Sequence, residues 1–279
     1  MNLSQRVARR INRQLNGANG LNQAHGRNLE NYRDILIVLL QKELKVRYNN
    51  KLLGYVWSVA NPLAAAIVYL VAFKILMRIQ IPDYLLILIT GTFTWQWFSN
   101  VVGGAPNVFV GNASIIKKVN FPRNIVLLCM VSNHMVHFLM SVPVIILFLF
   151  LHDRAPTAAW FYGMPLLMAV HFAMTYGLGL ALASINLFFR DLERLISILL
   201  NFAFYLTPVL YPVNQVPESV RHLLLLNPAA PLIGAWRDLL MDGQVNWFYL
   251  SVAAGYAALF LAIGSVIYRR LSWKFAEVL

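Results

Sequence analysis

Residues 155–189 of the chain read APTAAWFYGMPLLMAVHFAMTYGLGLALASINLFF, a run of 35 residues without Asp, Glu, Lys or Arg. A helix needs about 20 apolar residues to cross roughly 30 Å of hydrocarbon, so this run is long enough to span a membrane. Five other runs lack the same four residue types: 52–73, 84–116, 124–152, 195–217 and 243–268. A transmembrane barrel would instead show alternating segments of about ten residues. The sequence therefore predicts an all-α, polytopic membrane protein with six transmembrane helices.

Composition and charge agree with this prediction. The chain has 279 residues, of which 59% are hydrophobic and only 12% charged, a balance unlike that of a soluble protein of this size. If both termini are cytosolic, the inner segments hold 18 of the 23 Lys and Arg residues. The positive-inside rule then predicts a multi-pass protein of the inner (cytoplasmic) membrane with both termini in the cytosol. Because these basic residues flank apolar runs, we expect no nucleic-acid partner.

Three cytosolic segments have more than one interpretation. Residues 30–51 have apolar residues spaced by three and four, which predicts a basic amphipathic helix after a flexible cytosolic tail, 1–29. This helix could rest in the lipid headgroups or dock a cytosolic partner. Residues 111–121 predict a short cytosolic helix that is either a connector or a protein contact. FFRDLER, 188–194, holds two basic and two acidic residues close together, which fits a solvated turn or a salt-bridge hinge.

The region before the last predicted span is irregular. It contains YLTPVLYP at 205–212, and then an apolar run, 222–236, that is too short to cross and is interrupted by Asn227-Pro228. Such a run is typical of a segment that enters the membrane and returns. Irregular backbone at membrane depth is tolerated where protein buries it or where it lines a wet cavity. We therefore expect re-entrant helices, and a passage for something polar.

Catalytic motifs are missing from the chain. No lysine follows a glycine, so the phosphate-binding G-x-x-x-x-G-K-[ST] loop is absent, and no serine has the G-x-S-x-G context. His134 and His137 could share a metal, but three or four ligands are needed, and packing histidines are more common. The predicted spans hold no acidic residue that could couple transport to an ion. We expect no catalytic residue, no metal and no cofactor in this chain, and an energy source in a partner.

Seven motifs occur in one order along the chain: KELKVRYNNKLLGYVWSVANPL (42–63), ITGTFTWQWF (89–98), IIKKVNFPRN (115–124), NLFFRDLERL (186–195), YLTPVLYP (205–212), NP (227–228) and WRDLLMDG (236–243). In this order they resemble the membrane subunit of polysaccharide-exporting ABC transporters, the type-2 permeases. The resemblance covers the chain from about residue 30 to its end. It is most like the O-antigen exporters, with capsule and teichoic-acid exporters as further candidates.

The resemblance implies a six-helix permease domain, 30–279, that acts as a homodimer with two copies of a cytosolic ABC ATPase. ATP and Mg would be bound by that ATPase, and the substrate would be an undecaprenyl-linked polysaccharide within a membrane of lipids. Three rivals remain at this point: a type-2 permease for drugs or small lipids, a membrane-embedded transferase and a gated channel. The missing catalytic motifs disfavour the last two.

Candidate site residues fall into four groups. The segments that would contact the ATPase, with 111–121 as the coupling loop, contain Lys42, Glu43, Lys45, Arg47, Ile115, Ile116, Lys117 and Lys118. Aromatic rings on which sugars could stack along a substrate channel are Tyr48, Tyr55, Trp57, Tyr69, Phe202, Tyr205 and Tyr211. The inner mouth would hold Arg190, Asp191, Glu193 and Arg194. The outer gate region, 213–236 with its flanks, would involve Pro208, Pro212, Asn227, Pro228, Arg237 and Asp238.

Two further residue patterns have mainly structural interpretations. For Trp95 and Trp97 we favour an aromatic belt at the lipid interface over the channel. The small residues Ala173, Gly177 and Ala181 recur at every fourth position of the fourth predicted span, so another helix should approach closely there.

Overall fold

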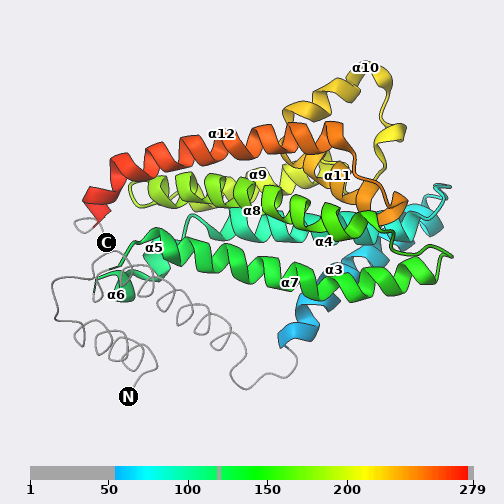
Figure 1. Cartoon of the computed structure of the whole chain (residues 1–279), viewed down its shortest axis with the longest axis horizontal. Helices are drawn as coiled ribbons and strands as arrows, with labels where there is room; N and C mark the ends of the chain where they lie inside the picture. The colour runs from blue at the N-terminus through cyan, green and yellow to red at the C-terminus, as the bar shows by residue number, and fades with distance from the viewer. Residues whose placement is uncertain (1–53, 118–120, 276–279) are drawn as a thin grey trace.

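The computed structural model describes residues 54–117 and 121–275, with the side chains of 54–56 and 58 left out. Throughout these residues the regular structure is helical. The long helices are α3 (Gly54–Leu70), continued by the π-helical η1 (Val71–Leu76), then α4 (Tyr84–Gly104), α7 (Asn124–Phe150), α8 (Ala159–Asn186), α9 (Leu192–Leu206), α11 (Ala229–Asp242) and α12 (Trp247–Leu271). The short ones are α5 (Val108–Gly111), α6 (Ala113–Ile116), η2 (Val213–Gln215), α10 (Glu218–Arg221), η3 (His222–Leu226) and η4 (Ser272–Lys274). Most long helices run along one axis (Figure 1).

Five helical stretches are long and apolar enough to cross a membrane: Val59–Leu76, Tyr84–Gly104, Asn124–Phe150, Ala159–Asn186 and Trp247–Lys274. They fall in five of the six predicted runs. The predicted tail 1–29 and amphipathic helix 30–51 lie outside the described residues. Pro62 lies within the first of these stretches, and α3 continues through it as an α-helix.

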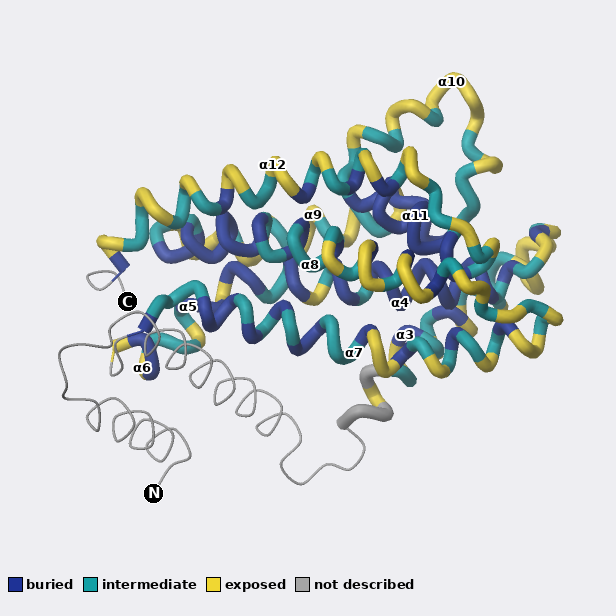
Figure 2. Tube along the Cα trace, viewed as in Figure 1, coloured by how far each residue is buried: buried dark blue, intermediate teal, exposed yellow. Residues whose placement is uncertain are grey.

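The remaining predicted span, 195–217, is not one helix. Helix α9 has 15 residues and ends at Leu206, after which Thr207 is extended, with φ −95° and ψ 144°. The reason is local, because Pro208 lacks an N–H and its ring excludes the helical conformation from the residue before it. The run 222–236 is likewise divided, between η3 and α11. Helix α11 is buried along most of its length against α4, α8 and α12 (Figure 2).

The small residues of α8 allow a close helix crossing, as predicted. A Cβ placed on Gly264 of α12 would lie 2.1 Å from the carbonyl oxygen of Gly177, and one on Gly177 would lie 2.4 Å from the amide nitrogen of Leu261. The two backbones therefore touch where neither residue has a side chain, which is a common device of helix packing in membranes.

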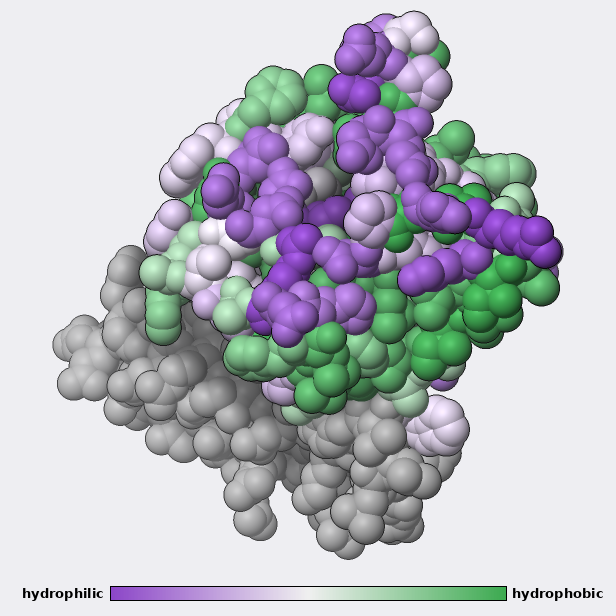
Figure 3. All heavy atoms as spheres, turned by 90° about the vertical axis from the view of Figure 1, so that its right-hand side faces the viewer, coloured by the Kyte–Doolittle hydropathy of each residue, from purple (hydrophilic) through white to green (hydrophobic). Residues whose placement is uncertain are grey.

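The turns at one end of the bundle are joined by a single arginine. The Arg154 guanidinium lies 2.7 Å from the carboxylate of Asp83 and 3.4 Å from that of Asp242, and it donates to the carbonyl of Met241. Hydrophilic residues gather on this end, with apolar surface beside them (Figure 3). That distribution fits an aqueous end of a membrane-embedded bundle.

Candidate functional site

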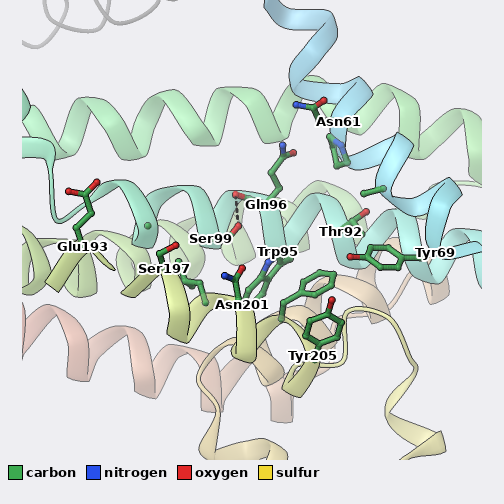
Figure 4. Close-up of a pocket in the computed structure, with 15 residues that line it drawn as sticks. Asn61, Tyr69, Thr92, Trp95, Gln96, Ser99, Glu193, Ser197, Asn201 and Tyr205 are labelled. Carbon is green, nitrogen blue, oxygen red and sulfur yellow. Dashed lines mark hydrogen bonds between the residues drawn. The ribbon is translucent and has the colours of Figure 1, made fainter. Parts of the chain in front are cut away.

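A groove of about 640 Å³ runs between α3, α4 and α9 (Figure 4). Its lining combines polar and aromatic side chains: Asn61, Pro62, Ala65, Tyr69, Thr92, Trp95, Gln96, Ser99, Gly103, Glu193, Ser197, Leu200, Asn201, Phe204 and Tyr205. Glu193 lies at one end and Tyr69 toward the other (Figure 4). Because α9 begins just after α8 ends, the Glu193 end is the one nearer to α5. Pro106, two residues before α5, accepts a hydrogen bond from Asn186 of α8.

Four aromatic rings form a continuous surface in the groove. The centroid of Phe204 lies 5.7 Å from those of both Tyr69 and Trp95, and 5.2 Å from that of Tyr205. The belt interpretation of Trp95 is wrong, because this residue is buried in the middle of α4 and faces the groove. Trp97 is also no belt residue, since it is buried and stacks on His171 at 3.8 Å.

Beside these rings lie polar groups that are free to bind a ligand. The side chains of Asn61, Gln96, Ser197 and Asn201 make no hydrogen bond with any residue in the described part of the chain. The Thr92 hydroxyl, by contrast, donates a hydrogen bond to the carbonyl of Leu88 at 2.6 Å. Each carboxamide offers both donors and an acceptor. The groove thus presents uncharged hydrogen-bonding groups next to apolar ring faces.

Only part of the predicted channel set lines this groove. Tyr69 and Tyr205 do, whereas Trp57 and Phe202 are exposed and lie outside its lining. Tyr211 lies beyond α9, and its hydroxyl donates to the Tyr205 carbonyl at 3.4 Å. The side chains of Tyr48 and Tyr55 fall outside the described residues.

Sequence reasoning placed Trp95 at the lipid interface rather than in the groove, and it missed the amides. A detectable signal was the spacing by four of Glu193, Ser197 and Asn201, which places them on one face of α9.

The predicted inner mouth is exposed. Arg190, Asp191, Glu193 and Arg194 are all solvent-accessible, and none of them forms an ion pair with another described residue. Of the four, Glu193 alone lines the groove. The arrangement agrees with the solvated turn and gives no support to the salt-bridge hinge.

Part of the predicted outer gate set meets at one buried guanidinium. Arg237 of α11 is 7% exposed and donates to three carbonyls of the segment that follows α9. Its Nη1 lies 3.1 Å from the oxygen of Tyr211, and its Nη2 lies 2.6 Å from that of Pro208 and 3.1 Å from that of Val209. These carbonyls are left unpaired where the helix stops, so Arg237 satisfies backbone groups that would be costly to bury alone.

Other contacts hold the same 207–212 segment. Asn227 donates to the Thr207 hydroxyl at 2.8 Å and accepts from the backbone of Ala229 at 3.1 Å. Tyr84 donates to the Leu210 carbonyl at 3.0 Å. Gly91 of α4 faces this segment, and a Cβ there would lie 2.5 Å from the Val209 oxygen. The motifs YLTPVLYP, NP and WRDLLMDG therefore meet at one place.

The remaining gate residues lie around this contact. Pro228 precedes α11, and Pro212 precedes η2. Asp238 points elsewhere: it accepts from Asn246 at 2.7 Å, and Asn246 in turn caps α12 through the Tyr249 amide. Asp238 thus joins α11 to α12 and makes no contact with the 207–212 segment.

The predicted coupling loop is anchored to the bundle. Ile115 and Ile116 of α6 are buried, whereas Lys117 is exposed. The Phe109 ring lies 5.3 Å from that of Phe275, beyond the end of α12. Lys42, Glu43, Lys45, Arg47 and Lys118 lie outside the described residues. The two isoleucines therefore fix α6 to its own chain, and Lys117 is available to another protein.

Among the described residues, no group of three or more His, Cys, Asp or Glu side chains lies close enough to hold a metal ion. The His134 and His137 rings lie 6.1 Å apart, centroid to centroid, on α7. Within residues 54–117 and 121–275, no third His, Cys, Asp or Glu joins this pair to make a metal site.

Comparisons with known proteins agree with this arrangement. The chain is 42% identical over 246 residues to the O-antigen export system permease protein RfbA of Klebsiella pneumoniae, covering 88% of this chain and 95% of that protein. It is 32% identical over 255 residues to RfbA of Myxococcus xanthus, covering 90% and 97%. It is 22% identical over 240 residues to the polysialic acid transport protein KpsM of Escherichia coli, covering 83% and 91%. The family described as "ABC-2 type transporter" matches residues 35–241. The chain is a multi-pass membrane protein that belongs to the ABC-2 type transporter family.

Proposed function

We propose that the chain is the membrane subunit of an ATP-driven exporter that moves lipid-linked polysaccharide, O-antigen foremost, across the cytoplasmic membrane. Two copies would form the conduit, and two copies of a cytosolic ABC ATPase would bind ATP and Mg. Both termini would lie in the cytosol, as the distribution of basic residues suggests. The chain has no nucleotide-binding loop of the G-x-x-x-x-G-K-[ST] type, so ATP must be bound by a partner. Membership of the ABC-2 type transporter family supports an ABC ATPase as that partner.

The groove between α3, α4 and α9 is the observation that carries this proposal. Sugars present hydroxyl groups and apolar C–H faces, which match free carboxamides and aromatic rings respectively. Asn61, Asn201 and Tyr205 are exposed, so the groove is open along one side. The outer surface of α9 is apolar, with Leu195, Ile198, Leu199, Phe202 and Leu206 exposed. A second copy placed on this side would close two grooves into one conduit.

Removing the rings tests this function. In the complex reconstituted with its ATPase, Trp95→Ala and Phe204→Ala should each lower the transport of undecaprenyl-linked glycan about tenfold, because a lost stacking surface costs on the order of 1–1.5 kcal/mol. Phe161→Ala, which removes a ring that is 88% exposed on α8, should leave transport unchanged. Stimulation of ATP hydrolysis by drug-like amphiphiles, with no response to glycan, would favour the small-molecule permease instead.

Coupling can be tested at the contact between α8 and the turn before α5. Asn186→Ala removes the hydrogen bond of 2.9 Å to the Pro106 carbonyl, which ties the segment just before the coupling loop to a membrane helix. We expect ATP hydrolysis within about twofold of wild type and transport reduced roughly three- to tenfold, as for the loss of about 1 kcal/mol. Ser184→Ala removes a buried bond within α8, to Leu180, and should leave the ratio of transport to hydrolysis unchanged. Equal ratios in both variants would exclude this contact from coupling.

A further inference from the structure

Among the described residues that line the groove, the one charged side chain is acidic. Glu193 is the carboxylate among its lining residues, and the described part of the lining contains no Lys, Arg or His. Every other polar group there is an amide, a hydroxyl, a phenol or the Trp95 indole. A groove that binds through neutral groups and carries one fixed negative charge treats anionic and uncharged ligands differently.

Basic residues near Glu193 do not reverse this sign. Arg190, Asp191 and Arg194 are exposed in the same turn, and their side chains lie outside the groove lining. One arginine and one aspartate cancel, and the remaining arginine is solvated, where water and salt weaken its field. Glu193 is as exposed as these neighbours, but its side chain lines the groove, so a ligand in the groove lies closer to its carboxylate than to the two guanidinium groups.

We propose that the groove selects uncharged glycans, and that Glu193 is the specificity-determining residue that disfavours acidic ones. This inference rests on the proposed function and narrows its substrate class. A hexuronic acid carries a carboxylate at neutral pH. As each such residue passes Glu193, two like charges come together at the end of the groove nearer α5. A neutral hexose meets instead a carboxylate that can accept hydrogen bonds from its hydroxyls.

Two matched substrates test the inference. One is an undecaprenyl-pyrophosphate-linked polymer of neutral hexoses. The other is the same polymer in which one hexose per repeat is oxidised at C6 to the uronic acid. Both are added to the full-length chain reconstituted with its ATPase, and glycan-stimulated ATP hydrolysis and transport are measured. For the wild type we expect at least a tenfold preference for the neutral polymer.

Two variants distinguish the effect of the Glu193 charge on this preference from the effect of a neighbouring carboxylate. Glu193→Gln keeps the shape and the hydrogen-bonding capacity, and should reduce the preference to less than about threefold, because the repulsion is lost. Asp191→Asn also removes one negative charge, but from a side chain outside the groove lining, and should reduce the preference much less than Glu193→Gln does. In the wild type the preference should also fall as salt rises from about 0.05 to 0.5 M, since screening shortens the reach of the Glu193 charge. A purely structural role of Glu193 would not produce that salt dependence.

The outcomes distinguish this inference from the function on which it rests. Equal stimulation of the wild type by both polymers would overturn the selectivity and leave the exporter function standing. An unchanged preference in Glu193→Gln would remove the role of this residue. Stimulation by neither polymer would overturn both proposals.

Discussion

Replacing Arg237 with methionine should destabilise the protein by about 3–5 kcal/mol and abolish transport. The change removes the donors to three buried carbonyls, those of Pro208, Val209 and Tyr211. It leaves them without partners, at a cost of roughly 1–3 kcal/mol for each buried group that finds no water. We expect a large fall in the unfolding temperature measured in lipid nanodiscs, together with loss of transport.

Arg221 provides a matched control. It is partly exposed and its Nη2 donates to one carbonyl, that of Val216, at 3.1 Å. Arg221→Met should therefore cost about 1 kcal/mol or less. Arg237→Lys should resemble Arg237→Met more than wild type, because a lysine ammonium cannot copy the planar fork that reaches three separated oxygens. Wild-type melting and transport in Arg237→Met would show that the 207–212 segment does not depend on this side chain.

The second large effect is expected at the crossing of α8 and α12. Gly264→Val places a branched side chain where even a single Cβ would lie 2.1 Å from the Gly177 oxygen. The two backbones must move apart, and overpacking of this kind costs about 3 kcal/mol or more. We expect a lowered unfolding temperature and a smaller folded fraction in size-exclusion chromatography.

Gly255 lies on the same helix and is the natural control. A Cβ at Gly255 would meet no heavy atom within 4 Å, so Gly255→Val should change stability by less than about 0.5 kcal/mol. Equal melting of the two variants would contradict the close crossing.

Several elements were predictable because one local cause dominates them. A charge-free run of sufficient length favours a membrane helix, and five of the six runs overlap one. The close approach at Gly177 follows from small residues at every fourth position. The end of α9 at Leu206 was also accessible, since Pro208 excludes a continuous helix, yet the absence of charge in 195–217 was given more weight than the proline.

The groove was harder to predict because its residues come from three helices. Helix α4 is buried on nearly all sides, so its sequence shows no face that would separate the groove-lining Trp95 from the core residue Trp97. The free amides of Asn61, Gln96 and Asn201 carry no local pattern, and their role becomes visible only where α3, α4 and α9 meet. The contacts predicted for 30–51 with an ATPase remain predictions.

The exposed side of the groove has a consequence for very long molecules. A closed tunnel must be entered by a free end, so the time needed to find its entrance grows with the length of a polymer. A groove that is open along one wall can bind an internal segment of the polymer, which enters sideways. With Asn61, Asn201 and Tyr205 at the open wall, a protomer could take up the middle of a polymer only before the second copy closes that wall, so the order of loading and dimer closure would decide whether a free end is needed.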